Sequence, residues 1–161
     1  MIEICPFEDR FAGAFKEMNL EWLDKYGLTE SHDIQVLNDP RGTIITPGGF
    51  IFLALEDDLP VGSAALMKEG DNHFELAKMS VIPAMRGRGI SKLLISRCID
   101  KAIESGAERL FLFSNHQLTT ALQLYTGFGF THVPVVDSPF ETADVRMELD
   151  LVNYAGRKKN L

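Results

Sequence analysis

The sequence has little of what several common functions require. Its 16 Lys and Arg stand against 23 Asp and Glu, a formal net charge of −7 at pH 7. Binding to a phosphate backbone needs concentrated Lys and Arg, so nucleic acid is not expected as the main partner. No apolar run approaches the roughly 18 residues of a membrane span, and no basic segment followed by an apolar one opens the chain. These absences predict a cytoplasmic protein without a membrane partner.

Cysteines and metal-ligand patterns are also sparse. Cys5 and Cys98 lie far apart, and Cys98 falls within a helical apolar pattern, so both are expected to be reduced core residues rather than a disulfide. The four histidines occur singly, so no metal site is predicted. The chain has no G-x-S-x-G and no G-x-x-x-x-G-K-[ST]. A covalent acyl-enzyme and a P-loop nucleotide site are therefore disfavoured.

The composition predicts one globular domain. With 161 residues, 45% of them hydrophobic, the chain is long enough to bury a core, and it contains no repeat or linker. We expect a domain over residues 1–152 and a polar, frayed tail over residues 153–161.

Apolar spacing predicts an α/β fold with a mixed, mostly antiparallel central sheet flanked by helices. Helical spacing occurs over 7–26, 32–37, 90–103 and 119–125, and strand-like segments occur over 50–55, 61–67, 74–81, 109–113, 130–136 and 144–151. The strands between 50 and 81 form an antiparallel meander, and the strand–loop–helix–strand segment that follows forms a crossover. Its helix begins at the sheet edge where ligands bind in open α/β folds.

The most informative segment is the end of a strand, a turn and the start of a helix over residues 79–91, MSVIPAMRGRGIS. Gly87 and Gly89 allow positive φ and let a ligand approach the backbone closely. The following helix start directs N–H groups and the positive end of its dipole at the same small volume. The pattern favours a phosphate cradle over the alternative, a solvated basic turn that needs glycine only to reverse direction.

Two motifs resemble the GCN5-related N-acetyltransferases. Arg86-x-x-Gly89-x-Ser91 is similar to the family's R/Q-x-x-G-x-G/A loop, with Ser91 where the family usually has Gly or Ala. Residues 121–130, ALQLYTGFGF, match its A-x-x-L-Y-x-x-x-G-F pattern. The resemblance covers nearly the whole chain and implies the same α/β fold. It implies an acetyl-coenzyme A-dependent enzyme that acetylates a small-molecule primary amine directly in a ternary complex, and homodimers are common in the family.

The resemblance also assigns cofactor contacts. Backbone groups of the loop would hold the pyrophosphate of acetyl-coenzyme A, and main-chain groups of Met79 and Val81 would hold the acetyl carbonyl and the pantetheine arm where the sheet splays. Asn115 matches a position that hydrogen-bonds this arm, although a turn asparagine is the alternative. The loop residues are Arg86, Gly87, Arg88, Gly89, Ile90 and Ser91.

Two side chains are candidates for proton transfer. Tyr125 of the second motif would protonate the departing thiolate as a general acid, the alternative being a tyrosine that only packs against Phe128 and Phe130. Glu75 matches a family position that takes the proton of the amine, and a buried carboxylate has a pKa suited to this task. The alternative for Glu75 is a carboxylate that faces solvent or pairs with a lysine.

The acceptor pocket of the family is built by the N-terminal helices and the last hairpin. Trp22, Tyr26, Glu30 and Asp33 are candidates for its lining, with Phe140 and Asp144, because carboxylates attract an ammonium and aromatic rings stack on it. Core packing and solvated turns are the alternatives. Three other functions are compatible with parts of this pattern: acetylation of a protein or peptide, non-catalytic sensing of acyl-coenzyme A, and binding of a nucleotide phosphate.

Overall fold

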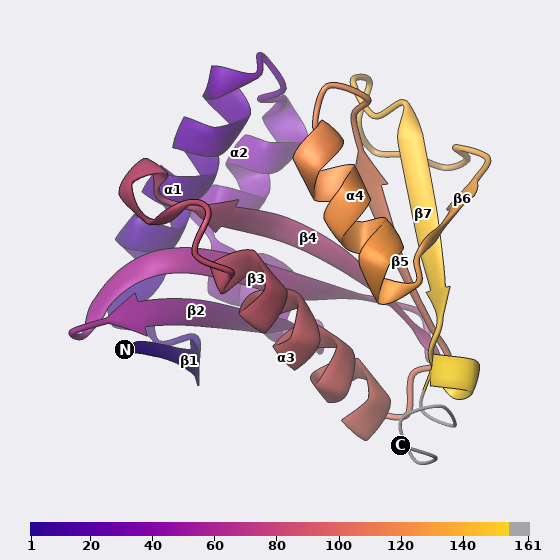
Figure 1. Ribbon diagram of the computed structural model, residues 1–161, viewed down its shortest axis with the longest axis horizontal. Helices are drawn as coiled ribbons and strands as arrows, with labels where there is room; N and C mark the ends of the chain where they lie inside the picture. The colour runs from indigo at the N-terminus through magenta and orange to yellow at the C-terminus, as the bar shows by residue number, and fades with distance from the viewer. Residues whose placement is uncertain (155–161) are drawn as a thin grey trace.

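The computed structural model describes residues 1–154, which form a seven-stranded sheet with helices on both faces (Figure 1). The strand order is β1-β2-β3-β4-β5-β7-β6, and only β4 and β5 are parallel neighbours. The predicted mixed, mostly antiparallel α/β fold is confirmed. The strands are β1 (Ile2–Pro6), β2 (Phe50–Glu56), β3 (Leu59–Glu69), β4 (His73–Val81), β5 (Arg109–Ser114), β6 (Thr131–Val133) and β7 (Val145–Asp150).

Helices α3 and α4 lie in front of the sheet in Figure 1, and α1 and α2 lie behind it. In front, an i, i+4 row of α3 packs on inward-facing strand residues such as Phe52 and Leu76. Behind, Phe15 of α1 and Leu37 of α2 pack on Ile51 of β2. Strand β2 is therefore apolar on both faces, as strands covered on both sides are. The helical elements are η1 (Asp9–Phe11), α1 (Ala12–Lys25), α2 (Ser31–Asn38), the π-helical η2 (Arg41–Ile45), η3 (Pro83–Met85), α3 (Ile90–Glu104) and α4 (Thr119–Phe128).

Several boundaries differ from the sequence-based expectation. The edge strand β1 was not predicted, because its five residues carry little alternation of apolar and polar side chains. Helix α4 includes Gly127, and Gly129, with φ of +104°, follows its last residue. Residues 151–154 form a helical turn, and residues 153 and 154 of this turn belong to the expected tail. The remaining residues of that tail, 155–161, lie outside the described residues. Cys5 and Cys98 are free thiols; Cys98 is buried in the core as expected, whereas Cys5 is only half-buried.

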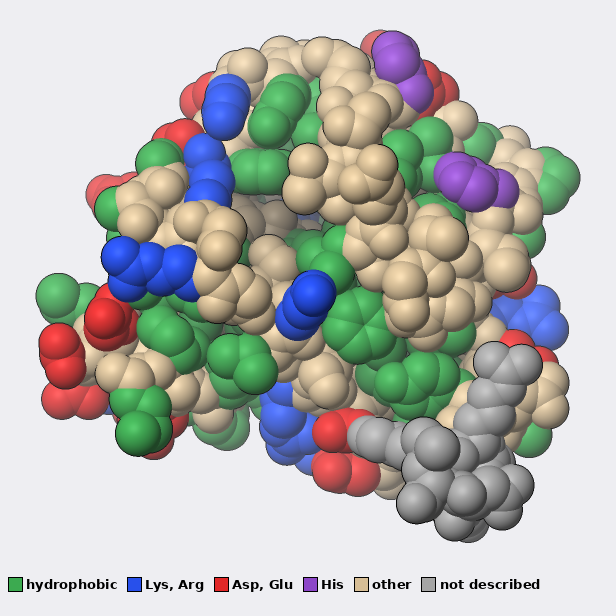
Figure 2. Space-filling view, viewed as in Figure 1, with side chains coloured by type: hydrophobic (Ala, Val, Ile, Leu, Met, Phe, Trp, Pro, Cys, Tyr) green, Lys and Arg blue, Asp and Glu red, His purple; other side chains and the backbone are tan. Residues whose placement is uncertain are grey.

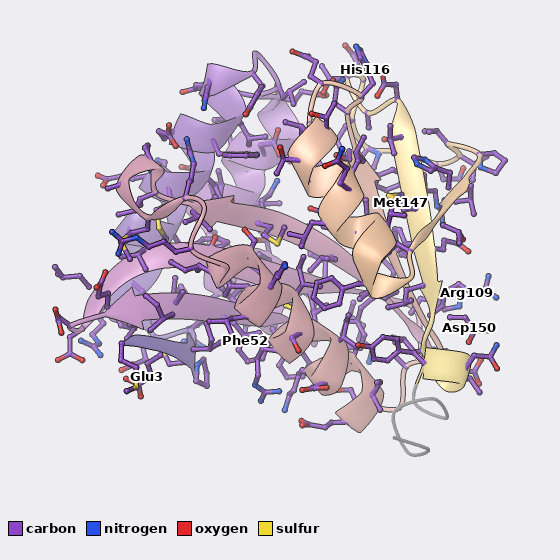
Figure 3. The ribbon with its side chains drawn as sticks, viewed as in Figure 1. Glu3, Phe52, Arg109, His116, Met147 and Asp150 are labelled. Atoms are coloured by element: carbon purple, nitrogen blue, oxygen red, sulfur yellow. The ribbon has the colours of Figure 1, made fainter. Side chains whose placement is uncertain are left out.

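The feature that positions the site is an opening between β4 and β5. These strands pair only from His73↔Arg109 to Glu75↔Phe111, after which each continues without the other. Beyond this point β4 contains a bulge, where Lys78 adopts a left-handed φ of +51°. Arg109, labelled in Figure 3, is the first residue of β5, and His116, also labelled there, lies two residues beyond the last, at the end where the sheet opens. This is the carboxyl edge of the parallel pair, where open α/β sheets bind ligands.

Candidate active site

The loop between β4 and α3 presents a row of free amides. Gly87 and Gly89 have φ of +80° and +78°, and no atom lies within 4 Å of the position that a Cβ would take at either residue. Their conformation, rather than packing, therefore requires glycine. The N–H groups of residues 87–92 donate to no acceptor in the described part of the chain. Together with the positive end of the α3 dipole, they form a site for an anion.

Arg86 fixes this loop to its neighbours. Its Nε donates to the Val81 carbonyl oxygen at 2.9 Å and its Nη2 donates to Glu21 Oε2 at 2.7 Å. Its guanidinium also lies over the Trp22 ring, 4.8 Å from the centroid. The Arg86 side chain thus holds the loop against β4 and α1, and the backbone amides remain the groups that face a ligand.

A groove of about 950 Å³ runs from this loop along α4. Three cationic side chains and no carboxylate line it, although the whole chain has a formal net charge of −7. Figure 2 shows Lys and Arg side chains on the rim of a hollow in this face of the molecule. Of the predicted cofactor residues, Arg88 and Asn115 do not line the groove, and Asn115 lines the adjoining cavity instead. Those that do are Met79, Val81, Arg86, Gly87, Gly89, Ile90, Ser91 and Tyr125, and the three cations are Lys25, Arg86 and Lys92.

A smaller cavity of about 120 Å³ continues from the groove into the opening between β4 and β5. Trp22, Met79, Leu118 and Tyr125 line both spaces. A ligand that extends along the groove from the amide row therefore reaches the cavity at Met79 and Tyr125. This junction brings the two predicted proton-transfer residues, Tyr125 and Glu75, to one space.

Tyr125 is buried at this junction. It is 9% exposed, and its ring packs edge-on against Phe130 with centroids 5.8 Å apart. Burial raises the pKa of the phenol well above its ordinary value of 10, and Cys98 raises it further. Within residues 1–154 its hydroxyl has no hydrogen-bond partner. The group is thus protonated at neutral pH.

Glu75 is buried on a central strand, with 5% exposure, so it is not the solvent-facing carboxylate of the alternative. Burial raises its pKa from 4.5 to about 7, opposed by the positive charge of Lys78 and, more weakly, of Arg146. Glu69 and Asp33 raise it further by repulsion. No described residue donates a hydrogen bond to this carboxylate. Glu75 can therefore both accept and release a proton near neutrality.

The predicted acceptor-binding residues divide among three places. Trp22 lines both spaces, whereas Tyr26 lines only the groove. Asp33 lines the cavity, but its carboxylate forms an ion pair with Lys78, and both side chains are at most 5% exposed. Asp33 also accepts a hydrogen bond from the backbone N–H of Glu30 at 2.9 Å. This carboxylate is engaged at both oxygens, and Glu30 itself lines neither space.

Glu30 fastens the loop between β6 and β7 to the start of α2. Its carboxylate accepts hydrogen bonds from the N–H of Glu141 at 2.8 Å, the N–H of Thr142 at 2.9 Å and the Thr142 hydroxyl. Burial opposes ionisation of Glu30, but these hydrogen bonds outweigh it and lower the pKa of the carboxyl. Phe140 and Thr142 of this loop line the cavity, so Glu30 holds one of its walls in place.

Two further polar residues have local partners. Asn115 lines the cavity, but its amide donates to the Thr142 carbonyl at 2.8 Å and accepts from the Gln117 N–H at 3.0 Å. A side-chain contact to a ligand would compete with these bonds. Asp144 bonds to His116 through that residue's backbone N–H and its ring, and it lies outside the cavity lining.

Sequence reasoning missed several cavity residues, of which Asn19 and Lys78 are the most polar. Asn19 follows Phe15 by four positions, so it lies on the apolar face of α1, where a polar residue is unusual. A polar residue at an apolar position of a helix was therefore a signal by which the sequence could have indicated Asn19. Lys78 gave none, because its burial depends on the bulge in β4 and on Asp33 of a distant helix.

Residues 1–154 contain no group of three or more His, Cys, Asp or Glu side chains placed to hold a metal ion. None of their helices is both long and apolar enough to cross a bilayer.

Comparisons with known proteins agree with this geometry. Residues 14–130 match the acetyltransferase (GNAT) family. YjgM, an uncharacterised N-acetyltransferase of Escherichia coli K12, is 30% identical over 116 residues, which cover 68% of this chain and 70% of that protein. A GNAT-family acetyltransferase of Staphylococcus aureus Mu50 shares the fold with a TM-score of 0.86 and 20% identity, covering 94% of this chain and 99% of the other.

A second solved structure shows the same fold with a ligand. The PaiA N-acetyltransferase of Thermoplasma acidophilum, determined in complex with coenzyme A, superimposes with a TM-score of 0.74 and 16% identity, covering 93% of this chain and 99% of the other. The fold and site thus define an acetyl-coenzyme A-dependent acetyltransferase. The chain belongs to the GCN5-related N-acetyltransferase (GNAT) family.

Proposed function

We propose that this enzyme transfers the acetyl group of acetyl-coenzyme A directly to the primary amine of a small molecule, with Tyr125 as the acid and Glu75 as the base. The observation that carries the proposal is the junction of the two spaces. A basic groove without carboxylates ends at Tyr125, and beyond it lies a cavity that contains a buried carboxylate with a pKa of about 7.

The chain's own groups fit acetyl-coenzyme A. The free amides of residues 87–92 would hold the diphosphate, and Lys25 and Lys92 of the groove, which unlike Arg86 are not in an ion pair with a described carboxylate, would stabilise its negative charges. Beyond Glu75, the edge of β4 that faces β5 has no strand partner, so the main chain at Met79 is available to the pantetheine arm and the acetyl carbonyl. Bound in this way, acetyl-coenzyme A would supply an acyl thioester at the mouth of the cavity.

The reaction balances with these groups. Glu75 takes a proton from the ammonium group of the acceptor, directly or through a water molecule, and the neutral nitrogen then attacks the thioester carbonyl carbon. The carbon–sulfur bond breaks, the thiolate receives the Tyr125 proton, and the second proton lost by the nitrogen restores the Tyr125 hydroxyl through water. The products are an amide and coenzyme A with a free thiol. Acceleration comes mainly from positioning the two substrates and from polarising the carbonyl. All of these groups come from one chain, and the proposal includes no metal.

The shape of the cavity supports a small acceptor over a polypeptide. Its volume of about 120 Å³ lies below the roughly 300–1,000 Å³ of typical ligand pockets. The hydrogen bonds of Glu30 hold the β6–β7 loop against the start of α2, so residues of both segments border the cavity. A peptide acceptor would need this contact to open. The placement of an acid and a base also favours catalysis over a sensing role, since binding alone needs neither.

The test is a thiol-release assay with acetyl-coenzyme A across alkylamines, polyamines, amino acids, aminoglycosides and peptides. The proposal predicts amine-dependent release of coenzyme A with at least one small amine. Tight binding of coenzyme A by calorimetry, without turnover of any amine, would instead identify a sensor. Turnover of peptides alone would identify a protein acetyltransferase.

A further inference from the structure

We infer that the acceptor is a compact amine with a single positive charge and an apolar substituent, and that the side-chain oxygen of Asn19 binds its amine group. This inference rests on the proposed function and narrows it to a substrate class. It depends on three features of the cavity: the orientation of Asn19, the pairing of the charged side chains, and the volume.

Hydrogen bonds fix the orientation of the Asn19 amide. Its nitrogen Nδ2 donates to the Phe15 carbonyl oxygen at 2.9 Å and to Ser63 Oγ at 3.0 Å. The Ser63 hydroxyl donates its own proton to the Lys78 carbonyl at 2.8 Å, so towards Asn19 it must accept. A carbonyl and an accepting hydroxyl both require the NH₂ group, and the amide cannot be reversed.

This arrangement leaves the oxygen Oδ1 of Asn19 as an acceptor without a donor in residues 1–154. Asn19 is 2% exposed and lines the cavity. In the described part of the chain, Arg146 Nε is the one fully buried side-chain polar atom without a partner, so Asn19 Oδ1 is reached from the cavity and can accept an N–H group there. The Glu75 carboxylate is another acceptor of this cavity without a donor among the described residues, and a primary amine has enough N–H groups for both.

The charges of the cavity limit the acceptor to one ammonium. Its lining contains three charged side chains, Asp33, Glu75 and Lys78. Asp33 and Lys78 neutralise each other in a buried ion pair, which leaves Glu75 as the only carboxylate available to a cation. A second ammonium would be buried without a counter-ion unless it displaced Lys78 from Asp33, and either event is costly.

Volume and lining then define the rest of the molecule. An engineered apolar cavity of roughly 150 Å³ in another protein holds benzene, so about 120 Å³ accommodates about six non-hydrogen atoms. Beside its polar groups, the cavity has aromatic walls that include Trp22, Phe113 and Phe140. An apolar substituent fits against these rings, whereas a second charged group would have no counter-ion.

The substrate class is tested with two amines of equal size. n-Pentylamine and 1,4-diaminobutane have the same number of non-hydrogen atoms and differ only in a terminal methyl or ammonium group. The inference predicts that kcat/KM of the wild-type enzyme is at least about tenfold higher for n-pentylamine, because the second ammonium would be buried unpaired. Equal or higher kcat/KM for the diamine would overturn the substrate class.

The role of Asn19 is tested with Asn19→Leu and Asn19→Ala, either of which suffices if the other does not fold. Each should lower kcat/KM for n-pentylamine about 10- to 100-fold, the range for one hydrogen bond to a charged group, with KM for acetyl-coenzyme A changed less than about twofold. Ser63→Ala is the matched control, because it removes the buried hydrogen bond between Asn19 Nδ2 and Ser63 Oγ and keeps the Asn19 side chain in place. It should lower the melting temperature while kcat/KM changes less than about threefold.

The outcomes separate this inference from the proposed function. If folded Asn19 variants keep wild-type kcat/KM, or if Ser63→Ala loses as much as they do, Asn19 is structural and does not bind the amine. If diamines or peptides are turned over but n-pentylamine is not, the enzyme is an acetyltransferase with a different acceptor. If no amine releases coenzyme A, the proposed function itself is wrong.

Discussion

Burial changes the proton chemistry of two side chains in complementary ways. At Tyr125 it raises an already high pKa, so the phenol remains a donor at any pH the enzyme meets. At Glu75 it raises a low pKa to about 7, so the carboxyl becomes a base that is poised to exchange protons. The same physical effect therefore suits Tyr125 to the proposed role of acid and Glu75 to the proposed role of base, because the two groups have different ordinary pKa values.

Tyr125→Phe removes the proposed acid and keeps the ring that packs on Phe130. We expect kcat to fall roughly 10- to 1,000-fold, since the thiolate must then leave without a proton, while the affinity for coenzyme A changes little. Steady-state kinetics and calorimetry measure the two quantities. Full activity of this variant across the pH range would remove Tyr125 from the mechanism.

Glu75 gives the enzyme a characteristic pH profile. A base acts in its deprotonated form, so kcat/KM should be low below pH 7, rise through about pH 7 and level off above it. In Glu75→Gln this inflection should disappear and kcat should fall. If the variant keeps the wild-type profile, the inflection belongs to another group and Glu75 is not the base.

The same carboxyl affects stability. Between pH 4.5 and about 7 the folded protein keeps a Glu75 proton that the unfolded chain releases, so this group destabilises the fold progressively as pH rises through that window. The cost approaches about 3 kcal/mol above pH 7, from about 1.4 kcal/mol per pH unit. Thermal melts of Glu75→Gln and wild type should therefore diverge in favour of the variant as pH rises from 5 to 8. A constant difference would contradict the raised pKa.

Helix α3 has a glycine of almost identical conformation at each end, and only one of them borders the groove. Gly89 has φ of +78° and Gly106 has φ of +79°, and neither has an atom within 4 Å of a built Cβ. Alanine at either position should destabilise the fold by about 1 kcal/mol. Only Gly89→Ala should also weaken coenzyme A binding, by about tenfold or more, because it displaces the amides. Calorimetry showing equal coenzyme A affinities in the two variants would refute the amide cradle.

The hydrogen bonds of the Glu30 carboxylate connect the start of α2 to the β6–β7 loop. Glu30→Ala removes three hydrogen bonds to residues 141 and 142, and it should speed amide hydrogen exchange at Thr142 and raise KM for the acceptor amine severalfold. Glu141→Ala is the control, because residue 141 contributes only its backbone N–H to this contact. Unchanged exchange at Thr142 in Glu30→Ala would show that the loop is held by its other contacts.

Elements and motifs that depend on neighbouring residues in the sequence could be predicted. Contacts between side chains that are far apart in the sequence could not. The glycine loop and the start of α3 follow from thirteen consecutive residues, and the structure gives them the expected geometry. Asp33 was predicted to attract the acceptor, but it lies against Lys78, 45 positions away in the sequence. Glu30 meets Thr142 across 112 positions. Periodicity gives no information on such pairs, because they depend on how the sheet twists and bulges.

Charge is separated across the whole molecule. The chain has a formal net charge of −7, yet its large groove has three cations and no carboxylate, and the adjoining cavity contains its charges as one ion pair and one titrating acid. The proposed anionic cofactor and the proposed cationic acceptor would therefore meet different surfaces, which adjoin at Met79 and Tyr125. This separation is what the fold supplies by opening between β4 and β5.

The central claim is that main-chain amides of residues 87–92 grip a diphosphate, and nuclear magnetic resonance tests it most directly. Coenzyme A is titrated into ¹⁵N-labelled protein, and amide shifts are followed residue by residue. We predict that the largest shifts occur at Gly87, Gly89 and their neighbours up to Lys92, and that inorganic pyrophosphate moves the same amides. Saturable binding of coenzyme A that leaves these amides unmoved would contradict the account.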